Sequence, residues 1–242
     1  MGVVDHMSML SRRGSITIAL FGIAFGLVGC GDDEAAQRKA FVGFLQTRII
    51  DKPGIHVPQL SDELARSFGA YAKHYAVITS FNAEMDKSVG SFLPKVMSAA
   101  AVTSVGDAMR KRDDIIAVRD MIVQIRAAIS QNLATAEASR VGLAQPQDLK
   151  VVYDAAFDRA VRAPAESLQN ALPPAESALQ SILTLTDYLN SHGDKVSVQG
   201  SIISTSDPKV QSQVNALLDD INKKSQRLRE AQDRVNKLMA GG

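Results

Sequence analysis

The C-terminal segment of this chain places apolar side chains at alternating spacings of four and three residues. Such spacing forms one stripe along an α-helix, and a stripe of about four heptads has to be covered by another helix. Asp207-Pro208 supplies a capping carboxylate and a proline at the first helical position. The chain is therefore expected to fold through long packed helices. The stripe positions are Val210, Val214, Leu217, Ile221, Lys224, Leu228, Ala231, Val235 and Leu238, and Lys224 and Ala231 interrupt its large apolar pattern.

Similar stripes predict further helices upstream. The expected helices cover about 35–50, 61–90, 107–143 and 146–161, and another helix passes through Leu179, Ile182, Leu185 and Leu189 before His192-Gly193 stops it. Pro146 is expected at a first helical position, and Ala163-Pro164 and Pro173-Pro174 predict fresh helix starts. The segment 92–105 is Ala-rich and fits more than one structure.

Residues 195–205 show a strand-like pattern in place of the helical one. Val196 and Val198 alternate with polar residues, Gln199-Gly200 predicts a turn, and β-branched residues follow. A small hairpin is the leading interpretation, and an irregular loop is the alternative. The predicted fold is all-α, an elongated bundle of long antiparallel helices with one small β-hairpin near residues 195–205.

The N-terminus carries the pattern of an export signal. Arg12 and Arg13 precede an uncharged, mostly apolar run of thirteen residues, 16–28, which fits a signal-peptide core. That run is shorter than the ~20 apolar residues that a membrane-spanning helix needs. Leu27-Val28-Gly29-Cys30 resembles a bacterial lipobox, in which the cysteine thiol is acylated and the leader is cut before it. The alternatives are an ordinary cleaved signal, a retained single-span anchor and a twin-arginine route, although Ser15 stands where the last has an apolar residue.

These observations predict three parts of the chain: a signal peptide over 1–29, a lipidated tether over 30–36 and a helical domain over 37–242. The tether spans only ~20 Å even when fully extended, at ~3.5 Å per residue. We therefore expect a protein held near the membrane and facing the periplasm. By resemblance to enterobacterial sorting, Gly31 after the lipidated Cys30 favours the outer over the inner membrane, and Asp32 weakens that preference. Met7 and Met9 are alternative start sites.

The charge balance after cleavage and the single cysteine give no support to nucleic-acid binding, anionic-lipid binding or thiol chemistry. Removing Arg12, Arg13 and Asp5 leaves 25 basic and 25 acidic residues, a formal net charge of zero. This balance gives no support to broad electrostatic binding of nucleic acid or anionic lipid. Cys30 is the single cysteine, so its acylation leaves no thiol for a disulfide, a metal site or a nucleophile.

Several polar residues could carry chemistry, but each has a simpler structural interpretation. Tyr71, His74 and Tyr75 share one side of a helix, yet a metal site needs three or four ligands and neither His56 nor His192 supplies them at paired spacing. We expect that group to pack. Asn82 takes the missing place in its helix stripe, where it sets helix register or lies at the surface.

The charged runs are also expected to have structural rather than catalytic roles. Arg110-Lys111-Arg112 followed by Asp113-Asp114 is expected to be a solvated, self-compensating helix start. Neighbours on a helix point about 100° apart, so neither Asp113-Asp114 nor Asp219-Asp220 forms a facing acid–base pair. The sequence has no glycine-rich phosphate loop and no Gly-x-Ser-x-Gly elbow. We expect no catalytic residue, no cofactor and no metal, and one modified residue, the lipidated Cys30.

Several segments resemble the YiaF-type bacterial lipoprotein family. The resemblance covers most of the chain from Phe44 onward, less so between Ser91 and Val141. It implies a bacterial envelope protein of undefined function, and it transfers no active site. The segments that carry it are 44–48, 58–61, Phe68-Gly69 with Tyr71 and Tyr75, 148–157, 164–169 and 195–198.

The leading interpretation is a membrane-anchored, non-catalytic helical binding or scaffold module with a protein partner in the periplasm. The alternative is a periplasmic lipid or small-molecule carrier with an apolar cavity between its helices. The final stripe is compatible with self-association as well as with packing inside one chain, so the sequence leaves the oligomeric state open.

Overall fold

The structure is a computed structural model that describes residues 30–90, 92 and 102–241. The predicted leader, residues 1–29, lies outside the described residues, as does most of the unassigned segment 92–105. Across the described ranges, no helix is both long enough and apolar enough to cross a membrane.

The described chain is almost entirely helical. Three π-helical turns continue α1, α3 and α7, at Gln46–Ile50, Asp86–Gly90 and Asp158–Arg162, and a 3-10 turn, Gly69–Tyr71, joins α2 to α3. The elements are α1 (Cys30–Leu45), α2 (Asp62–Phe68), α3 (Ala72–Met85), α5 (Val105–Arg110), α6 (Arg112–Val141), α7 (Gln147–Phe157), α8 (Ala163–Ser191), β1 (Ser197–Gln199), β2 (Ile202–Ser204) and α9 (Pro208–Ala240).

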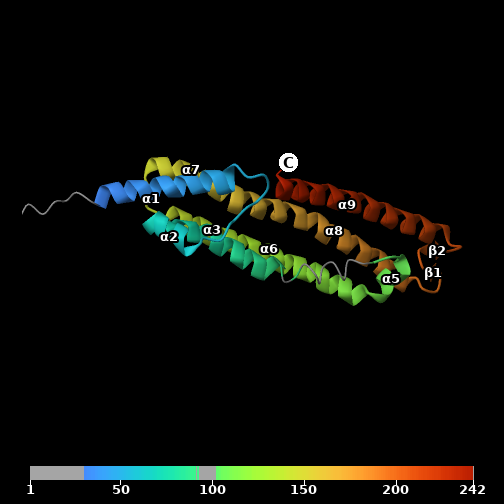
Figure 1. The fold of residues 1–242 in the computed structure, drawn as a ribbon. Helices are drawn as coiled ribbons and strands as arrows, with labels where there is room; N and C mark the ends of the chain where they lie inside the picture. Colours follow the sequence, from blue (N-terminus) through green and yellow to red (C-terminus); the bar gives the residue numbers. More distant parts are fainter. Residues whose placement is uncertain (1–29, 91, 93–101, 242) are drawn as a thin grey trace, which may run out of the picture.

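The helices form an elongated bundle (Figure 1). α1, α2 and α7 lie at one end, and α5 and the hairpin lie at the other. α8 is the central rod, since it packs along both α6 and α9, and α3 packs on α6. β1 and β2 pair antiparallel, with Val198 opposite Ile203. The predicted mostly-α bundle with one small hairpin is confirmed.

Two predicted helix boundaries are wrong. The helix expected over 107–143 is interrupted at Lys111, which separates α5 from α6. The start of α5 is fixed by a local cap: Ser104 Oγ accepts from the Asp107 backbone N–H, and the Asp107 carboxylate accepts from the Thr103 N–H. Pro146 is a cap residue, and α7 begins one residue later, at Gln147.

The helix start predicted at Ala163-Pro164 is confirmed, since α8 begins at Ala163 with Pro164 and Glu166 in its first turn. The start predicted at Pro173-Pro174 is wrong, because helical structure continues through it to Ser191. A π-helical turn immediately precedes Pro164, a bond pattern by which helices absorb an interruption. Pro173 and Pro174 lie inside α8. A proline inside a helix costs ~3 kcal/mol, and packing of α6 and α9 against α8 offsets this cost.

The first helix begins earlier than expected. It starts at Cys30 rather than near Ala35, so residues 30–36 are helical and not an extended tether. Asp33 and Glu34 follow closely, and carboxylates in a first turn interact favourably with the helix dipole. At ~1.5 Å per residue the segment spans ~9 Å, about half the length expected for an extended chain.

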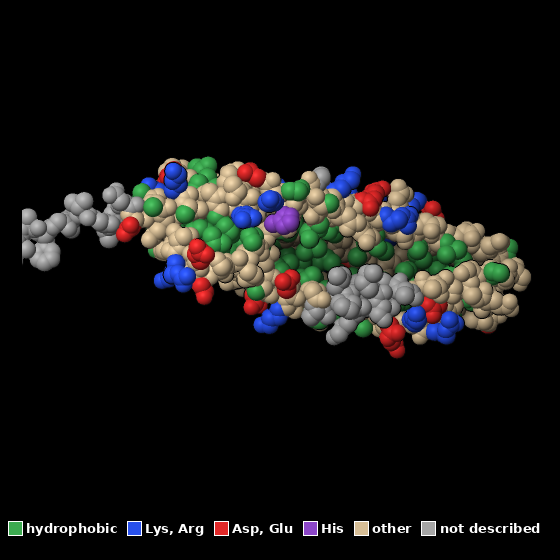
Figure 2. Space-filling view, viewed as in Figure 1, with side chains coloured by type: hydrophobic (Ala, Val, Ile, Leu, Met, Phe, Trp, Pro, Cys, Tyr) green, Lys and Arg blue, Asp and Glu red, His purple; other side chains and the backbone are tan. Residues whose placement is uncertain are grey.

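Buried side chains form one large cluster and two smaller ones. The large cluster joins α1, α3 and α7 around aromatic residues, among them Phe41, Phe68, Tyr75 and Phe157. A second cluster lies between α8, α9 and the hairpin, and a third between α5, α6 and α8. Figure 2 shows apolar side chains gathered in a hollow midway along one face, between the α8–α9 layer and α6.

Candidate functional site

A groove of about 280 Å³ with a mainly apolar surface lies between α3 and α6. Its walls follow helical spacing on both sides, so each helix contributes one face. Several wall residues are small, so their side chains leave space beside Val77 and Phe81. The lining residues are Lys73, Ala76, Val77, Ser80, Phe81 and Glu84 from α3 and Asn132, Thr135, Ala136 and Ser139 from α6.

Polar groups mark the limits of the groove. Lys73 and Glu84 stand eleven residues apart on α3, ~16 Å along the helix, and carry opposite charges. Asn132 crosses one end and donates its side-chain N–H to Ser88 Oγ at 3.1 Å. Glu84 is itself paired with Lys87 at 3.8 Å. The groove therefore has an apolar floor with polar ends, which suits an amphipathic segment better than a small charged ligand.

The tyrosine and histidine group predicted to pack does so. Tyr153 Oη donates to the backbone carbonyl of His74 at 2.9 Å, and Tyr75 Oη donates to that of Pro58 at 2.7 Å. Burial raises the pKa of both phenols. Burial also lowers the pKa of His74, whose Nδ1 lies 3.1 Å from Gln145 Nε2. Each polar end is thus paired to another segment of the chain.

The remaining histidines lie elsewhere. His56 is exposed in the loop after α1, and the His192 ring stacks on Tyr188 with ring centroids 4.2 Å apart. Within the part of the chain that the structure describes, no three His, Cys, Asp or Glu side chains gather as metal ligands. Asn82 is half-buried and donates to the Ile78 carbonyl of its own helix at 2.9 Å.

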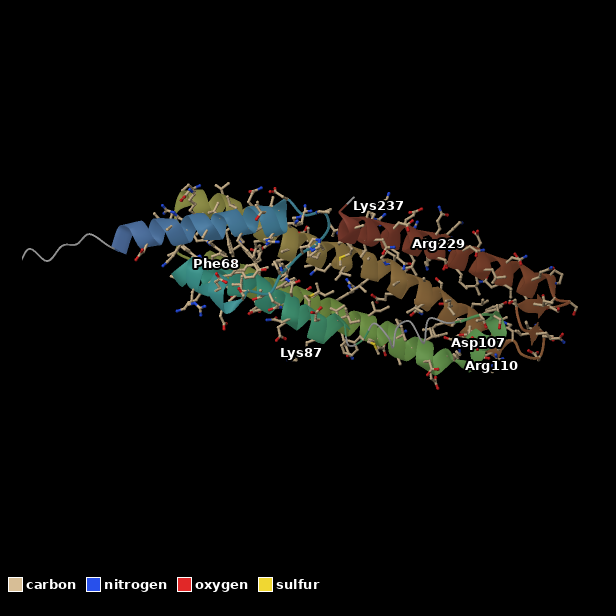
Figure 3. The ribbon with its side chains drawn as sticks, in the orientation of Figure 1. Phe68, Lys87, Asp107, Arg110, Arg229 and Lys237 are labelled. Carbon is tan, nitrogen blue, oxygen red and sulfur yellow. The ribbon has the colours of Figure 1, made fainter. Side chains whose placement is uncertain are left out.

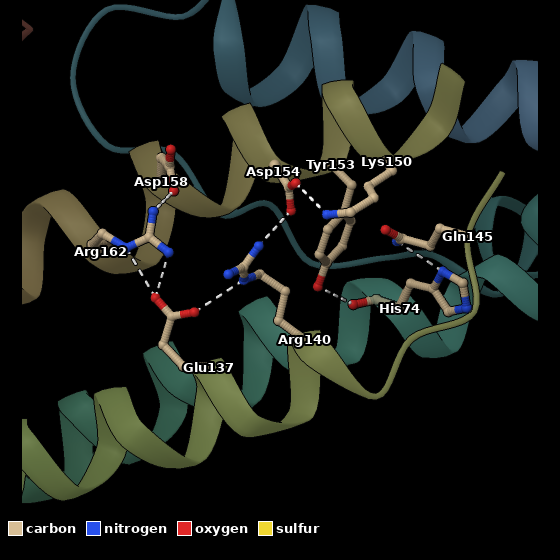
Figure 4. Close-up of polar contacts among 9 residues, drawn as sticks. All are labelled: His74, Glu137, Arg140, Gln145, Lys150, Tyr153, Asp154, Asp158 and Arg162. Atoms are coloured by element: carbon tan, nitrogen blue, oxygen red, sulfur yellow. Dashed lines mark hydrogen bonds and ion pairs between the residues drawn. The ribbon is translucent and has the colours of Figure 1, made fainter. Parts of the chain in front are cut away.

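A charged network at the junction of α6 and α7 was missed by the sequence analysis (Figure 4). Glu137 accepts from Arg162 at 2.5 Å and from Arg140 at 3.0 Å, and Arg140 donates to Asp154 at 2.7 Å. Lys150 and Asp158 complete the network at its two ends. Arg140 and Arg162 also lie over the Phe157 ring, 5.2 and 5.8 Å from its centroid. The network joins α6, α7 and the π-helical turn.

The pKa shifts of Glu137 and Asp154 show that both carboxylates are stabilised in their ionised form by neighbouring cations. Burial opposes ionisation of Glu137, but hydrogen bonds from Arg162 and Arg140 outweigh it and lower the carboxyl pKa. For Asp154, burial is likewise outweighed by hydrogen bonds from Lys150 and Arg140, which lower its pKa. Three cations balance three carboxylates, so this network holds helices together. Its only sequence signals were local pairs at helical spacing, Lys150 with Asp154 and Asp158 with Arg162.

Lys224, the polar residue in the apolar stripe of α9, is paired with polar side chains of α8 and α9. Its Nζ donates to Ser181 Oγ on α8 and to Asp220 Oδ2, each at 2.8 Å, while Ser181 donates to Asp220 at 2.6 Å. The hydrogen bond from Lys224, followed by that from Ser181, lowers the pKa of Asp220. Because the lysine donates to the serine oxygen, it does not act as the base of a serine nucleophile. The trio is a polar clip between α8 and α9.

The charged run at the start of α6 is self-compensating, as expected. Arg110 and Lys111 pair with Asp107 at 3.4 and 3.2 Å, and Arg112 reaches Asp187 on α8 at 2.6 Å. Figure 3 shows Asp107 and Arg110 at the end of the bundle opposite α1. Asp219 and Asp220 each pair with a lysine four residues on and not with one another. Cys30 is the first residue of α1.

Comparison with known proteins identifies the family to which this chain belongs. A family model described as a protein of unknown function, DUF3053, matches residues 17–236. The uncharacterized protein YiaF of Escherichia coli strain K12 is 28% identical over 202 residues, which cover 83% of this chain and 85% of the relative. The YiaF proteins of Escherichia coli O157:H7 and Shigella flexneri match to the same extent. No solved structure matches the chain.

Proposed function

This chain belongs to the DUF3053 family of proteins of unknown function, and on that premise we propose that it is a lipid-anchored protein of the bacterial envelope whose helical domain binds a partner without catalysis. The domain faces the periplasm, with the outer membrane favoured over the inner. The observation that carries the binding role is the open apolar groove between α3 and α6.

The anchoring part of the proposal is supported by the N-terminal sequence. A basic pair, a short apolar run and Leu27-Val28-Gly29-Cys30 occur in the order of a lipoprotein signal. The family match begins at residue 17, so Leu27-Val28-Gly29-Cys30 lies within the matched stretch. Two or more acyl chains give stable attachment, at ~0.8 kcal/mol for each buried methylene.

The non-catalytic part is supported by how the polar side chains are paired. Glu137 and Asp154 are each shared by two cations, and Ser181 receives its hydrogen bond from the residue that would have to be its base. An enzyme site needs a group whose pKa is shifted and which also meets a substrate in a cleft. The groove lining contains Lys73 and Glu84, ~16 Å apart along α3, too far for joint acid–base work.

Photo-crosslinking in living cells tests the binding role. A photoreactive side chain at Ser80 or Ser139, which line the groove, should capture the same protein in the full-length lipidated chain. The matched control is Ser212, an exposed serine of α9. Ala76→Lys, which places a charge on the groove floor, should abolish capture from both groove positions. Equal capture at Ser212, or capture that survives Ala76→Lys, would count against the groove.

A lipid or small-molecule carrier remains the second candidate, and the apolar floor of the groove is the observation in its favour. The volume of about 280 Å³ lies just below the ~300–1,000 Å³ of typical ligand pockets. Inserted side chains of a protein partner fit this space better than a whole lipid. Native mass spectrometry separates the two, because a carrier keeps a small ligand through purification and a docking groove does not.

A further inference from the structure

We propose that the end of the bundle around the base of α1 rests on the bilayer surface through the exposed side chains of Leu64, Val141 and Val151. These three residues form the α1-end patch. The inference rests on the proposed acylation of Cys30 and adds to it an orientation of the folded domain. The occupant of the patch is the lipid headgroup layer.

The exposure of these side chains is unusual for the described part of the chain. Val141 is 78% exposed, Val151 61% and Leu64 38%, and they make up half of the large hydrophobic residues that are exposed among the described residues. Single exposed aliphatic residues need no explanation, but apolar residues gathered at one place mark a contact surface. Figure 2 shows hydrophobic surface over α7 at this end of the molecule.

The contacts of neighbouring residues bring the patch to one end. Arg140 on α6 holds Asp154 on α7 at 2.7 Å. Val141 is the last residue of α6 and Val151 is the fifth residue of α7, so both lie close to the short connection between these helices. Leu64 lies in α2, one turn before Phe68. In Figure 1 α2 and α7 lie beside the middle of α1, one below and one above it, and the first turns of α1 project beyond them.

The distance from the proposed anchor to the patch is short. Phe68 packs on Phe41 of α1, with ring centroids 5.2 Å apart. Arg38 of α1 approaches Asp148 in the first turn of α7 at 3.4 Å, and it follows Cys30 by eight residues of continuous helix. Eight helical residues span ~12 Å. The headgroup layer of one leaflet is ~5–8 Å thick. A helix of this length standing upright would hold the α1-end patch above the headgroups, so the contact requires the bundle to tilt by roughly 50–65° from the membrane normal.

The charges at this end of the bundle favour an apolar rather than an electrostatic contact with the membrane. The end carries both signs, with Asp33, Glu34 and Asp148 near Arg38 and Lys150. Such a surface gains little from anionic lipid, because attraction and repulsion cancel. Apolar insertion at the interface is the contribution that remains. The contact should therefore persist in zwitterionic vesicles and at high salt.

The test uses single-cysteine labelling of the full-length lipidated protein in phosphatidylcholine vesicles. Acylation consumes the thiol of Cys30, so Val141→Cys or Val151→Cys introduces one free thiol for a fluorophore. Ile202→Cys is the matched control, because Ile202 is an aliphatic residue with 67% exposure in the hairpin at the opposite end. Headgroup-quencher lipids should quench the fluorophore at positions 141 and 151 several-fold more than at position 202.

Each outcome has a distinct meaning. Equal quenching at all three positions in vesicle-bound protein overturns the orientation and leaves the anchoring intact. Stronger quenching at position 202 also overturns it. Protein that carries no acyl chain and stays out of the vesicle fraction overturns the proposed anchoring together with this inference. Loss of the contrast in zwitterionic vesicles, with its return in anionic ones, would contradict apolar insertion.

Discussion

Gly54 and Gly241 meet so closely that neither position has room for a side chain. A Cβ atom on Gly241 would overlap the backbone nitrogen of Gly54, and a Cβ atom on Gly54 would overlap the carbonyl oxygen of Met239. Both glycines have positive φ angles, 72° and 83°. The turn that follows α1 and its π-helical extension therefore lies backbone to backbone with the last turn of α9.

Gly54→Ala should destabilise the fold by about 1–3 kcal/mol, because a left-handed conformation alone costs an alanine ~1–2 kcal/mol and the overlap adds to it. Urea denaturation followed by circular dichroism measures the change. Gly43→Ala is the matched control: Gly43 lies inside α1, and a Cβ atom added there would meet nothing within 4 Å, so alanine should gain ~0.5–1 kcal/mol. Equal effects at the two glycines would contradict the close approach.

The network around Glu137 predicts a moderate loss on substitution. Glu137→Gln keeps the shape of the side chain but leaves Arg140 and Arg162 without their shared carboxylate, so a loss of about 1–2 kcal/mol is expected. Asp219→Asn is the control, since Asp219 forms an exposed pair with Lys223 on the surface of α9 and exposed pairs contribute little. A loss no larger than that of the control would show that the network does not hold α6 to α7.

The same carboxylate gives stability a defined pH dependence. The pKa of Glu137 is lower in the folded than in the unfolded chain, where it is about 4.3. The stabilisation is therefore fully present above that value and is lost as the pH falls through the lower folded pKa. The stability difference between the parent protein and Glu137→Gln should shrink between pH 6 and pH 3. A difference that stays constant, or grows, across this window would contradict the assigned hydrogen bonds.

Lys224→Met should preserve or raise the denaturation midpoint. Methionine completes the apolar stripe of α9, and the half-exposed Asp220 still accepts from Ser181. Lys223→Met, one residue away on the exposed side, should give no gain. A lower midpoint for Lys224→Met alone would mean that the polar clip between α8 and α9 contributes more than the apolar contact that replaces it.

Local patterns in the sequence predicted the helices well, because apolar stripes such as that of α9 are set by neighbours within one helix. The hairpin was predicted for the same reason, since Val198 and Ile203 are only five residues apart. The break at Lys111 and the continuous passage through Pro173 and Pro174 were not predicted. Both segments make contacts with other elements: the Gly106 N–H of α5 donates to the Gly200 carbonyl of the hairpin, and α8 packs between α6 and α9.

The candidate site was harder to predict than the fold. The small residues of the groove, such as Ala76 and Ala136, stand at helical spacing, but small residues also occur on ordinary exposed faces. The groove exists only because α3 packs beside α6. Similarly, the pairing of Arg140 with Asp154 depends on the angle between α6 and α7. Neither relationship can be read from the spacing of residues within one helix.

Acylation at Cys30 supports both the proposed function and the orientation on the bilayer, so its direct test is metabolic labelling with an alkyne fatty acid, combined with membrane fractionation. The parent protein should incorporate the label and sediment with membranes. Cys30→Ala should lose the label and leave the membrane fraction, while Gly43→Ala, which leaves the lipobox intact, should behave as the parent does. Label that survives in Cys30→Ala would contradict lipid anchoring at this residue.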